Sequence, residues 1–226
     1  MLAKTLPEFI FFDLDDTLLD DHVSTQFGVD ALFAQYSEAV IVDRHQRWDE
    51  ALQVYYPAFL AGEITVQALQ IARIRFVLPE LDLSDEEALQ AFEYFLVNYV
   101  EQSVLFPEAH AVVMALKDKG VGLGVISNGP DDMQLRKLKA VGLYEAFDVV
   151  VTAERAGVGK PNVAIFELAL QEANQPASAC WCVGDNLKND VLAAKQAGLQ
   201  GVLIDRAGDV AAKYDGEWIG SLEDLL

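Results

Sequence analysis

Short, uninterrupted apolar runs recur along the chain, and each of them ends at a polar residue or a glycine. These runs lie at residues 9–12, 121–126, 147–151, 180–183 and 201–204. Apolar and polar residues do not alternate within them. We therefore predict β-strands that are buried on both faces, which is typical of a parallel sheet.

Segments with a helical pattern separate the later runs. The segment that starts at Pro107 ends at Gly120, the next one starts at Pro130, and a third starts at Pro161. A fourth spans residues 187–196 and is followed by Gly198. Proline is common near the start of a helix, and glycine is common just past its end. Alternating strands and helices predict an α/β fold, a Rossmann-like doubly wound parallel sheet covered by helices.

Residues 19–103 differ from the rest because their pattern is helical only. One apolar stripe is formed by Val29, Leu32, Phe33, Tyr36 and Val40. Ser84 and Glu87 have the spacing of a capping box at a helix start. We predict an inserted all-α cap domain at residues 19–103 and a catalytic core made of residues 1–18 and 104–226. Asp20 and Asp21, at the start of the insertion, are expected to be solvated.

Composition narrows the classes of protein that fit this pattern. The chain has 226 residues, 52% of them hydrophobic, and a formal net charge of −20. Such an apolar content excludes a disordered acidic tail, and the negative charge argues against nucleic acid or an anionic membrane as a partner. There is neither a signal-peptide pattern nor an apolar run of about 18 residues. Because Cys180 and Cys182 alone form no disulfide framework, a cytoplasmic protein is expected.

Acidic residues follow two of the predicted strands. Asp13 and Asp15 come directly after the first strand, whereas Asp185 and Asp190 follow the strand at 180–183. Ligands of open parallel sheets bind at the carboxyl ends of the strands, near the point where strand order reverses. Two carboxylates about 4 Å apart repel by about 4 kcal/mol at an intermediate dielectric, so a cluster of them needs a cation. Oxygen ligands without His or Cys favour Mg²⁺.

Groups that suit an anion follow the other strands. Ser127 offers a hydroxyl, and Asn128 and Gly129 offer backbone N–H groups just before the helix that starts at Pro130. Lys160 precedes Pro161, which disfavours helical geometry at the lysine and makes it a candidate point charge for phosphate. A metal site, an anion cradle and a carboxylate together indicate phosphoryl transfer with Asp13 as the nucleophile.

Four motifs in this order resemble those of the haloacid dehalogenase superfamily, in its branch with a helical cap and of phosphatase type. The motifs are FFDLDDTLLD at residues 11–20, VISNG at 125–129, GVGKPNVAIF at 157–166 and VGDNLKND at 183–190. The resemblance covers the chain outside the cap. It implies a Mg²⁺-dependent phosphatase that acts on a small phosphorylated metabolite, such as a nucleotide or a sugar phosphate.

The resemblance also implies roles for individual residues. Asp13 would become an aspartyl phosphate, and Asp15 would protonate the leaving alcohol and then deprotonate the attacking water. Thr17 and Asp16 would shape the turn after the nucleophile. Mg²⁺ would be bound by Asp13, by Asp15 through its backbone carbonyl, by Asp185 and, directly or through water, by Asp190. The transferring phosphoryl group would be bound by Ser127, Asn128 and Lys160.

Related reactions are separated by single residues. Dehalogenases of this superfamily lack an acid two residues after the nucleophile, whereas Asp15 is present here. Phosphonate hydrolases use a cap lysine, and residues 19–103 contain none. A sugar-phosphate mutase shares the acid pair and the cap type and remains an alternative. Two others are a phospho-accepting signalling module, disfavoured by the long insertion and Asp15, and a binding protein that has lost catalysis.

Overall fold

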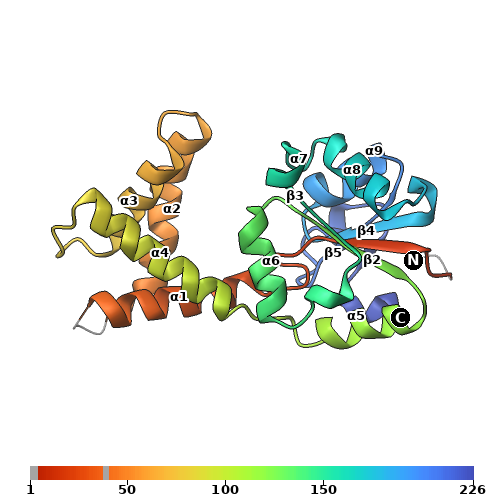
Figure 1. Cartoon of the computed structure of the whole chain (residues 1–226), viewed down its shortest axis with the longest axis horizontal. Coiled ribbons are helices and arrows are strands. Elements are labelled where there is room, and N and C mark those ends of the chain that lie inside the picture. Colours follow the sequence, from red (N-terminus) through yellow and green to blue (C-terminus); the bar gives the residue numbers. More distant parts are fainter. Residues whose placement is uncertain (1–4, 38–40) are drawn as a thin grey trace. The chain divides into compact units, whose positions relative to one another are not determined.

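The computed structural model describes residues 5–37 and 41–226 (Figure 1). They form two compact units. The larger one combines the chain up to Asp21 with Ser103–Leu226, and the smaller one spans His22–Gln102. Among the described residues, no helix is both long and apolar enough to cross a membrane. Val40, which the sequence places on a helical stripe, lies outside the described residues.

The larger unit is built on a parallel sheet of six strands in the described part of the chain, in the order β3-β2-β1-β4-β5-β6. Five of the strands are at the predicted apolar runs. The sixth was missed because it has only two residues, one of which, Trp218, is exposed. The strands are β1 (Phe9–Phe12), β2 (Gly122–Ser127), β3 (Val149–Thr152), β4 (Cys180–Gly184), β5 (Gln200–Ile204) and β6 (Trp218–Ile219).

The order of the strands places a switch point between β1 and β4. From β1 the chain continues to β2 and β3 on one side, then returns to β4, β5 and β6 on the other. Phe12 at the end of β1 pairs with Val125 of β2 and with Val183 of β4. The residues that follow these three strands therefore emerge at one edge of the sheet, where open α/β sheets bind their ligands.

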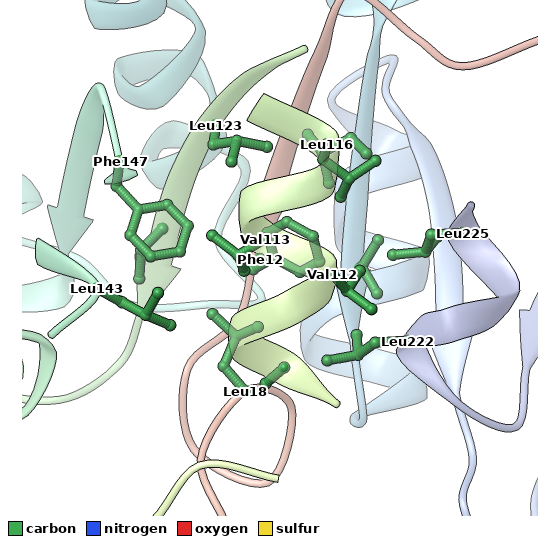
Figure 2. Close-up of a cluster of buried hydrophobic side chains, with 14 of the residues drawn as sticks. Phe12, Leu18, Val112, Val113, Leu116, Leu123, Leu143, Phe147, Leu222 and Leu225 are labelled. Atoms are coloured by element: carbon green, nitrogen blue, oxygen red, sulfur yellow. The ribbon is translucent and has the colours of Figure 1, made fainter. Parts of the chain in front are cut away.

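Alternate residues of each strand point to opposite faces, and helices cover both faces (Figure 1). Ile10 and Phe12 pack with residues of α5, α6 and the short helix η5, and Figure 2 shows Phe12 beside Val112, Val113 and Leu116 of α5. Phe9 and Phe11 pack with α8 and α9 on the other face. The covering helices are α5 (Ala109–Asp118), α6 (Asp131–Ala140), α8 (Val163–Ala173), α9 (Ala193–Gln196) and η5 (Leu222–Leu225). The prediction of a Rossmann-like α/β core is confirmed.

The helix predicted over residues 187–196 is not regular. It begins as a π-helix, η3 (Leu187–Leu192), and only its last turn, α9, is α-helical. Asn186 caps the π-helix with its side chain, and the Asp190 carboxylate folds back to accept a hydrogen bond from the Asn186 N–H at 2.9 Å. Hydrophobic periodicity does not report such a local contact. Short helices also lie where none was predicted: η1 (Tyr144–Ala146), α7 (Ala153–Ala156), η2 (Ala177–Ala179) and η4 (Ala211–Lys213).

The smaller unit has helices as its regular structure, in line with its sequence pattern. They are α1 (Asp21–Tyr36, whose first residue belongs to the larger unit), α2 (Arg44–Leu60), α3 (Val66–Val77) and α4 (Asp85–Glu101). Trp48 of α2 lies 4.1 Å from Phe95 of α4, measured between ring centroids. The capping box at Ser84 and Glu87 is formed as the sequence predicts, with reciprocal side-chain and backbone hydrogen bonds.

We expect the core on the α5 face to dominate the stability of the larger unit. Leu116→Ala removes a side chain that is fully buried in α5 and should lower the free energy of unfolding by about 2–5 kcal/mol. Met114→Ala on the same helix changes a side chain that is 39% exposed, and it should cost less than about 1 kcal/mol. Urea unfolding followed by circular dichroism measures both. Equal losses in the two variants would contradict this assignment of the core.

Candidate active site

The residues singled out in the sequence meet in one cleft of about 190 Å³ at the carboxyl edge of the sheet, within the larger unit. Asp13 and Asp15 come from the loop after β1, Asp185 from the position directly after β4 and Asp190 from the π-helix η3. The anion-binding candidates come from the loops after β2 and before α8. The cleft is lined by Asp13, Asp15, Ser127, Asn128, Gly129, Lys160, Asp185, Asn186, Asn189 and Asp190. Segments far apart in the chain therefore converge as the strand-end argument expects.

Carboxylates crowd one end of this cleft. One oxygen from each of Asp13, Asp185 and Asp190 lies within 4.8 Å of the others. Burial, reinforced by the Asp190 charge and opposed by Lys160, raises the pKa of Asp13 to about 7. Burial and the charges of Asp190 and Asp16 raise the pKa of Asp185 to about 6. Both pKa values are raised because the carboxylates are buried close to one another, and oxygen donors at this spacing fit a hard divalent cation.

Lys160 supplies part of that charge. Its ammonium donates to Asp13 Oδ1 at 2.5 Å, to Asp190 Oδ1 at 2.6 Å and to the backbone carbonyl of Ile126 at 2.8 Å. Burial opposes the charged form, but the two carboxylates outweigh it and raise the pKa of Lys160 above its ordinary value. Lys160 thus stays charged and ties Asp13 to Asp190.

The turn after β1 holds Asp13 at the base of the cleft. The Asp13 N–H donates to the Val183 carbonyl of β4 at 2.9 Å. The buried Thr17 hydroxyl lies 3.4 Å from Asp13 Oδ2 and accepts from the Asp185 N–H at 3.1 Å. Asp16 has a φ of 60°, in the left-handed region that a tight turn requires. These contacts join the two loops that carry the acids.

The backbone at the end of β4 lies in close contact with the Asp190 side chain. A Cβ on Gly184, the last residue of β4, would lie 2.4 Å from Asp190 Cγ. Only glycine leaves room there for the carboxyl group, so the strand end and the π-helix can pack directly against each other.

The Asn128 side chain binds the backbone of Lys160 rather than facing an anion. Its Oδ1 accepts from the Lys160 N–H at 2.6 Å and its Nδ2 donates to the Lys160 carbonyl at 3.0 Å. The amide thus clamps the backbone of Lys160, which precedes a cis peptide bond to Pro161. The Asn128 side chain is therefore engaged by the backbone of Lys160, and only its backbone N–H is left as a candidate donor to an anion.

Ser127 presents a hydroxyl whose acceptor positions are already filled. Ser127 Oγ accepts from the Gly129 N–H at 3.2 Å and from Gln134 Nε2 at 2.6 Å. A hydroxyl has two acceptor positions and one proton. The hydroxyl proton of Ser127 is therefore left to donate a hydrogen bond to an anion in the cleft.

Two polar residues of α6 that the sequence reasoning missed contact Asp15. Gln134 Nε2 donates to Asp15 Oδ2 at 2.9 Å, and Lys137 Nζ donates to Asp15 Oδ1 at 2.6 Å. Both side chains are fully buried. Their i, i+3 spacing on the helix that follows Ser127 was the sequence signal that could have placed Gln134 and Lys137 on one face of α6. Leu138, the next residue, is buried.

Asp21, expected to be a solvated residue, is only partly solvated. Its carboxylate lies 3.3 Å from Lys137 Nζ, and its side chain is 31% exposed. The buried Lys137 ammonium, already paired with Asp15, attracts Asp21 as a second carboxylate partner.

Comparison with known proteins identifies the family. The sequence profile of haloacid dehalogenase-like hydrolases matches residues 8–198. The chain belongs to this family. It is 30% identical to the pyrimidine 5′-nucleotidase YjjG of Escherichia coli over 193 residues, which cover 85% of this chain and 83% of that protein. It is 31% identical to a glyceraldehyde 3-phosphate phosphatase of Methanothermobacter thermautotrophicus, with 87% and 84% covered.

Solved structures share the fold of this haloacid dehalogenase-like hydrolase. A hydrolase of this superfamily from Bacillus subtilis, YfnB, solved bound to magnesium, has a TM-score of 0.81 at 21% identity and covers 98% of this chain and 97% of its own. Others with the fold are described as a 2-haloacid dehalogenase and a candidate β-phosphoglucomutase. The predicted superfamily is confirmed, and relatives named as phosphatases support its class of phosphoric monoester hydrolases.

We expect cation binding to strengthen as pH rises. Because Asp13 and Asp185 have pKa values raised to about 7 and about 6, both carry protons at low pH that a cation must displace. The Mg²⁺ affinity should therefore increase between about pH 5 and about pH 7 and level off near about pH 8. Isothermal titration calorimetry with Mg²⁺ alone measures it.

Two variants distinguish Mg²⁺ binding at this cluster from weak binding to the many other acidic residues of the chain. Asp185→Asn should weaken Mg²⁺ binding by at least about tenfold, whereas Asp209→Asn, at an exposed position outside the cleft, should not change it. An affinity that is independent of pH, or equal in the two variants, would count against a cation at Asp13, Asp185 and Asp190.

Proposed function

We propose that this protein is a Mg²⁺-dependent phosphatase that hydrolyses a small phosphomonoester through an aspartyl phosphate on Asp13. The proposal is carried by one observation: Asp13 and Asp15 line the same cleft, and each is paired with its own buried lysine. Asp13 is buried and oriented by Lys160, whereas the Asp15 side chain is 32% exposed and is paired with Lys137. Such different surroundings suit a nucleophile and a proton donor.

In the first half of the reaction, an Asp13 oxygen attacks phosphorus and the bond from phosphorus to the ester oxygen breaks. Asp15 gives its proton to the departing oxygen, so an alcohol leaves and Asp13 carries the phosphoryl group. Ser127 and Lys160 line the cleft. The Ser127 proton would donate to a negative oxygen of the transferring group, whereas Lys160, whose three N–H donors are taken by Asp13, Asp190 and the Ile126 carbonyl, would act through its positive charge.

In the second half, water attacks the phosphorus of the aspartyl phosphate. Asp15, now a carboxylate, takes a proton from that water, and inorganic phosphate leaves with the bond to Asp13 broken. We assign Asp13, the Asp15 backbone carbonyl, Asp185 and Asp190 to the binding of Mg²⁺. When bound, Mg²⁺ would neutralise negative charge on the transferring phosphoryl group.

The charges of the cluster support a divalent ion. Asp13, Asp185 and Asp190 together exceed the single positive charge of Lys160 by two when all are ionised. One divalent cation balances that excess.

The relatives support the proposed substrate class. A nucleotidase and a triose-phosphate phosphatase both match the chain over most of their length, so we propose a small phosphorylated metabolite. We further propose that the smaller unit, predicted from the sequence as residues 19–103, acts as the cap that distinguishes leaving groups.

The test is phosphate release from p-nitrophenyl phosphate. The wild-type protein should release phosphate with Mg²⁺ and stop when EDTA is added. Asp13→Asn should lower kcat by at least about 10³-fold because it removes the nucleophile, whereas Asp118→Asn, exposed at the end of α5, should retain full activity.

Other outcomes would point to the alternative functions. A mutase would interconvert sugar phosphates without net phosphate release, and a signalling module would keep a long-lived acyl phosphate after treatment with a phosphate donor. Measurable turnover by Asp13→Asn would refute the covalent role of Asp13.

A further inference from the structure

The carboxyl group of Asp15 is held at both oxygens by the same helix. Lys137 Nζ lies 2.6 Å from Oδ1, and Gln134 Nε2 lies 2.9 Å from Oδ2. Donors at both oxygens fix the plane of the carboxyl group. It therefore cannot rotate freely toward or away from the cleft.

Both donors come from positions where a polar side chain is unfavourable. Gln134 and Lys137 are 0% exposed. Burying an ammonium and an amide is unfavourable unless they find partners, and here those partners are Asp15, Asp21 and Ser127. Gln134 Oε1 is buried and has no hydrogen-bond partner among the described residues, so the amide is placed for its donors rather than for its oxygen.

Gln134 also links Asp15 to the anion cradle. Its Nε2 donates to Ser127 Oγ at 2.6 Å as well as to Asp15. The amide fits because residue 129 is glycine: a Cβ there would lie 2.3 Å from Gln134 Nε2. One side chain therefore sets the distance between the proposed proton donor and the hydroxyl that we propose binds the phosphoryl group.

We propose that Gln134 and Lys137 are positioning residues that hold Asp15 in the geometry for proton transfer to and from the substrate. This inference rests on the proposed phosphatase function. It assigns the two residues to the reaction rather than to stability alone, because both act on the one carboxyl group that would move protons in each half of the reaction.

Leaving-group dependence separates positioning from a structural role. p-Nitrophenolate leaves without needing a proton, whereas phenolate is more basic and gains more from a correctly placed acid. The esters p-nitrophenyl phosphate and phenyl phosphate have the same ring. A misplaced Asp15 should therefore slow the second ester much more than the first.

The variants are Lys137→Met and Gln134→Met, which keep side-chain length and remove the donors. The matched control is Lys139→Met, at an exposed position of the same helix. For Lys137→Met we expect kcat/KM to fall by about 10²-fold on phenyl phosphate but by less than about tenfold on p-nitrophenyl phosphate. Gln134→Met should show the same selectivity with a smaller loss, and Lys139→Met should match the wild type on both esters.

A second readout follows hydrolysis of the phosphoenzyme. kcat/KM covers the steps up to departure of the leaving group, but Asp15 also serves the later attack of water. With p-nitrophenyl phosphate, Lys137→Met should therefore release a rapid burst of p-nitrophenolate equal to the enzyme concentration, followed by slower turnover.

These measurements decide whether Gln134 and Lys137 position Asp15 for the reaction or only stabilise the fold. Equal losses on the two esters, or no loss, would overturn the positioning role and leave a structural ion pair. If Lys137→Met fails to fold by circular dichroism, Gln134→Met carries the test, because its replacement also removes the unsatisfied Oε1. Absence of phosphate release by the wild type and Lys139→Met would instead refute the proposed phosphatase function.

Discussion

The carboxyl edge of the sheet depends on one buried ion-pair network around Lys160. Its ammonium joins Asp13 after β1, Asp190 in η3 and the Ile126 carbonyl in β2, so a single charge connects three separate stretches of the chain. Without it, buried carboxylates would repel each other in a poorly hydrated site. Lys160 is in turn fixed by the Asn128 amide, which holds its backbone on both sides. The positions of the acids therefore follow from how this charge is placed.

A second lysine gives the neighbouring acid a different environment. Asp15 lies two residues after Asp13, but it pairs with Lys137 from α6 and keeps part of its side chain exposed. Two carboxyl groups of the same chemical type can then take different roles, since environment rather than residue type sets what each one does. The Gln134 amide connects this second arrangement to Ser127 and thus to the anion cradle. The site is two lysine-centred networks that share one cleft.

The fold alone does not decide the reaction. Structures with the same architecture include proteins described as dehalogenases and as a candidate mutase, so the chemistry must be argued from side chains. In our proposal Asp15 is the side chain that separates an ester-cleaving site from a dehalogenase-like one. Its supporting residues lie on α6, which packs on the sheet through Leu138. The helix that completes the hydrophobic core therefore also delivers both donors to Asp15.

The sequence by itself determined five of the strands, the longer helices and the motif residues. Uninterrupted apolar runs located five strands because a strand buried on both faces must be apolar throughout, and Asp13, Asp185 and Lys160 were found because they follow such runs or belong to a recognisable motif. Gln134, Lys137 and Asp21 were not identified, because polar residues in a helix are expected to be solvated until their burial is known. The π-helical turn and the clamp by Asn128 were missed because both depend on side-chain contacts with the backbone that hydrophobic periodicity does not report. Only the tertiary structure decided these features, since each is stabilised by a partner distant in the sequence or by a local backbone contact that periodicity does not encode.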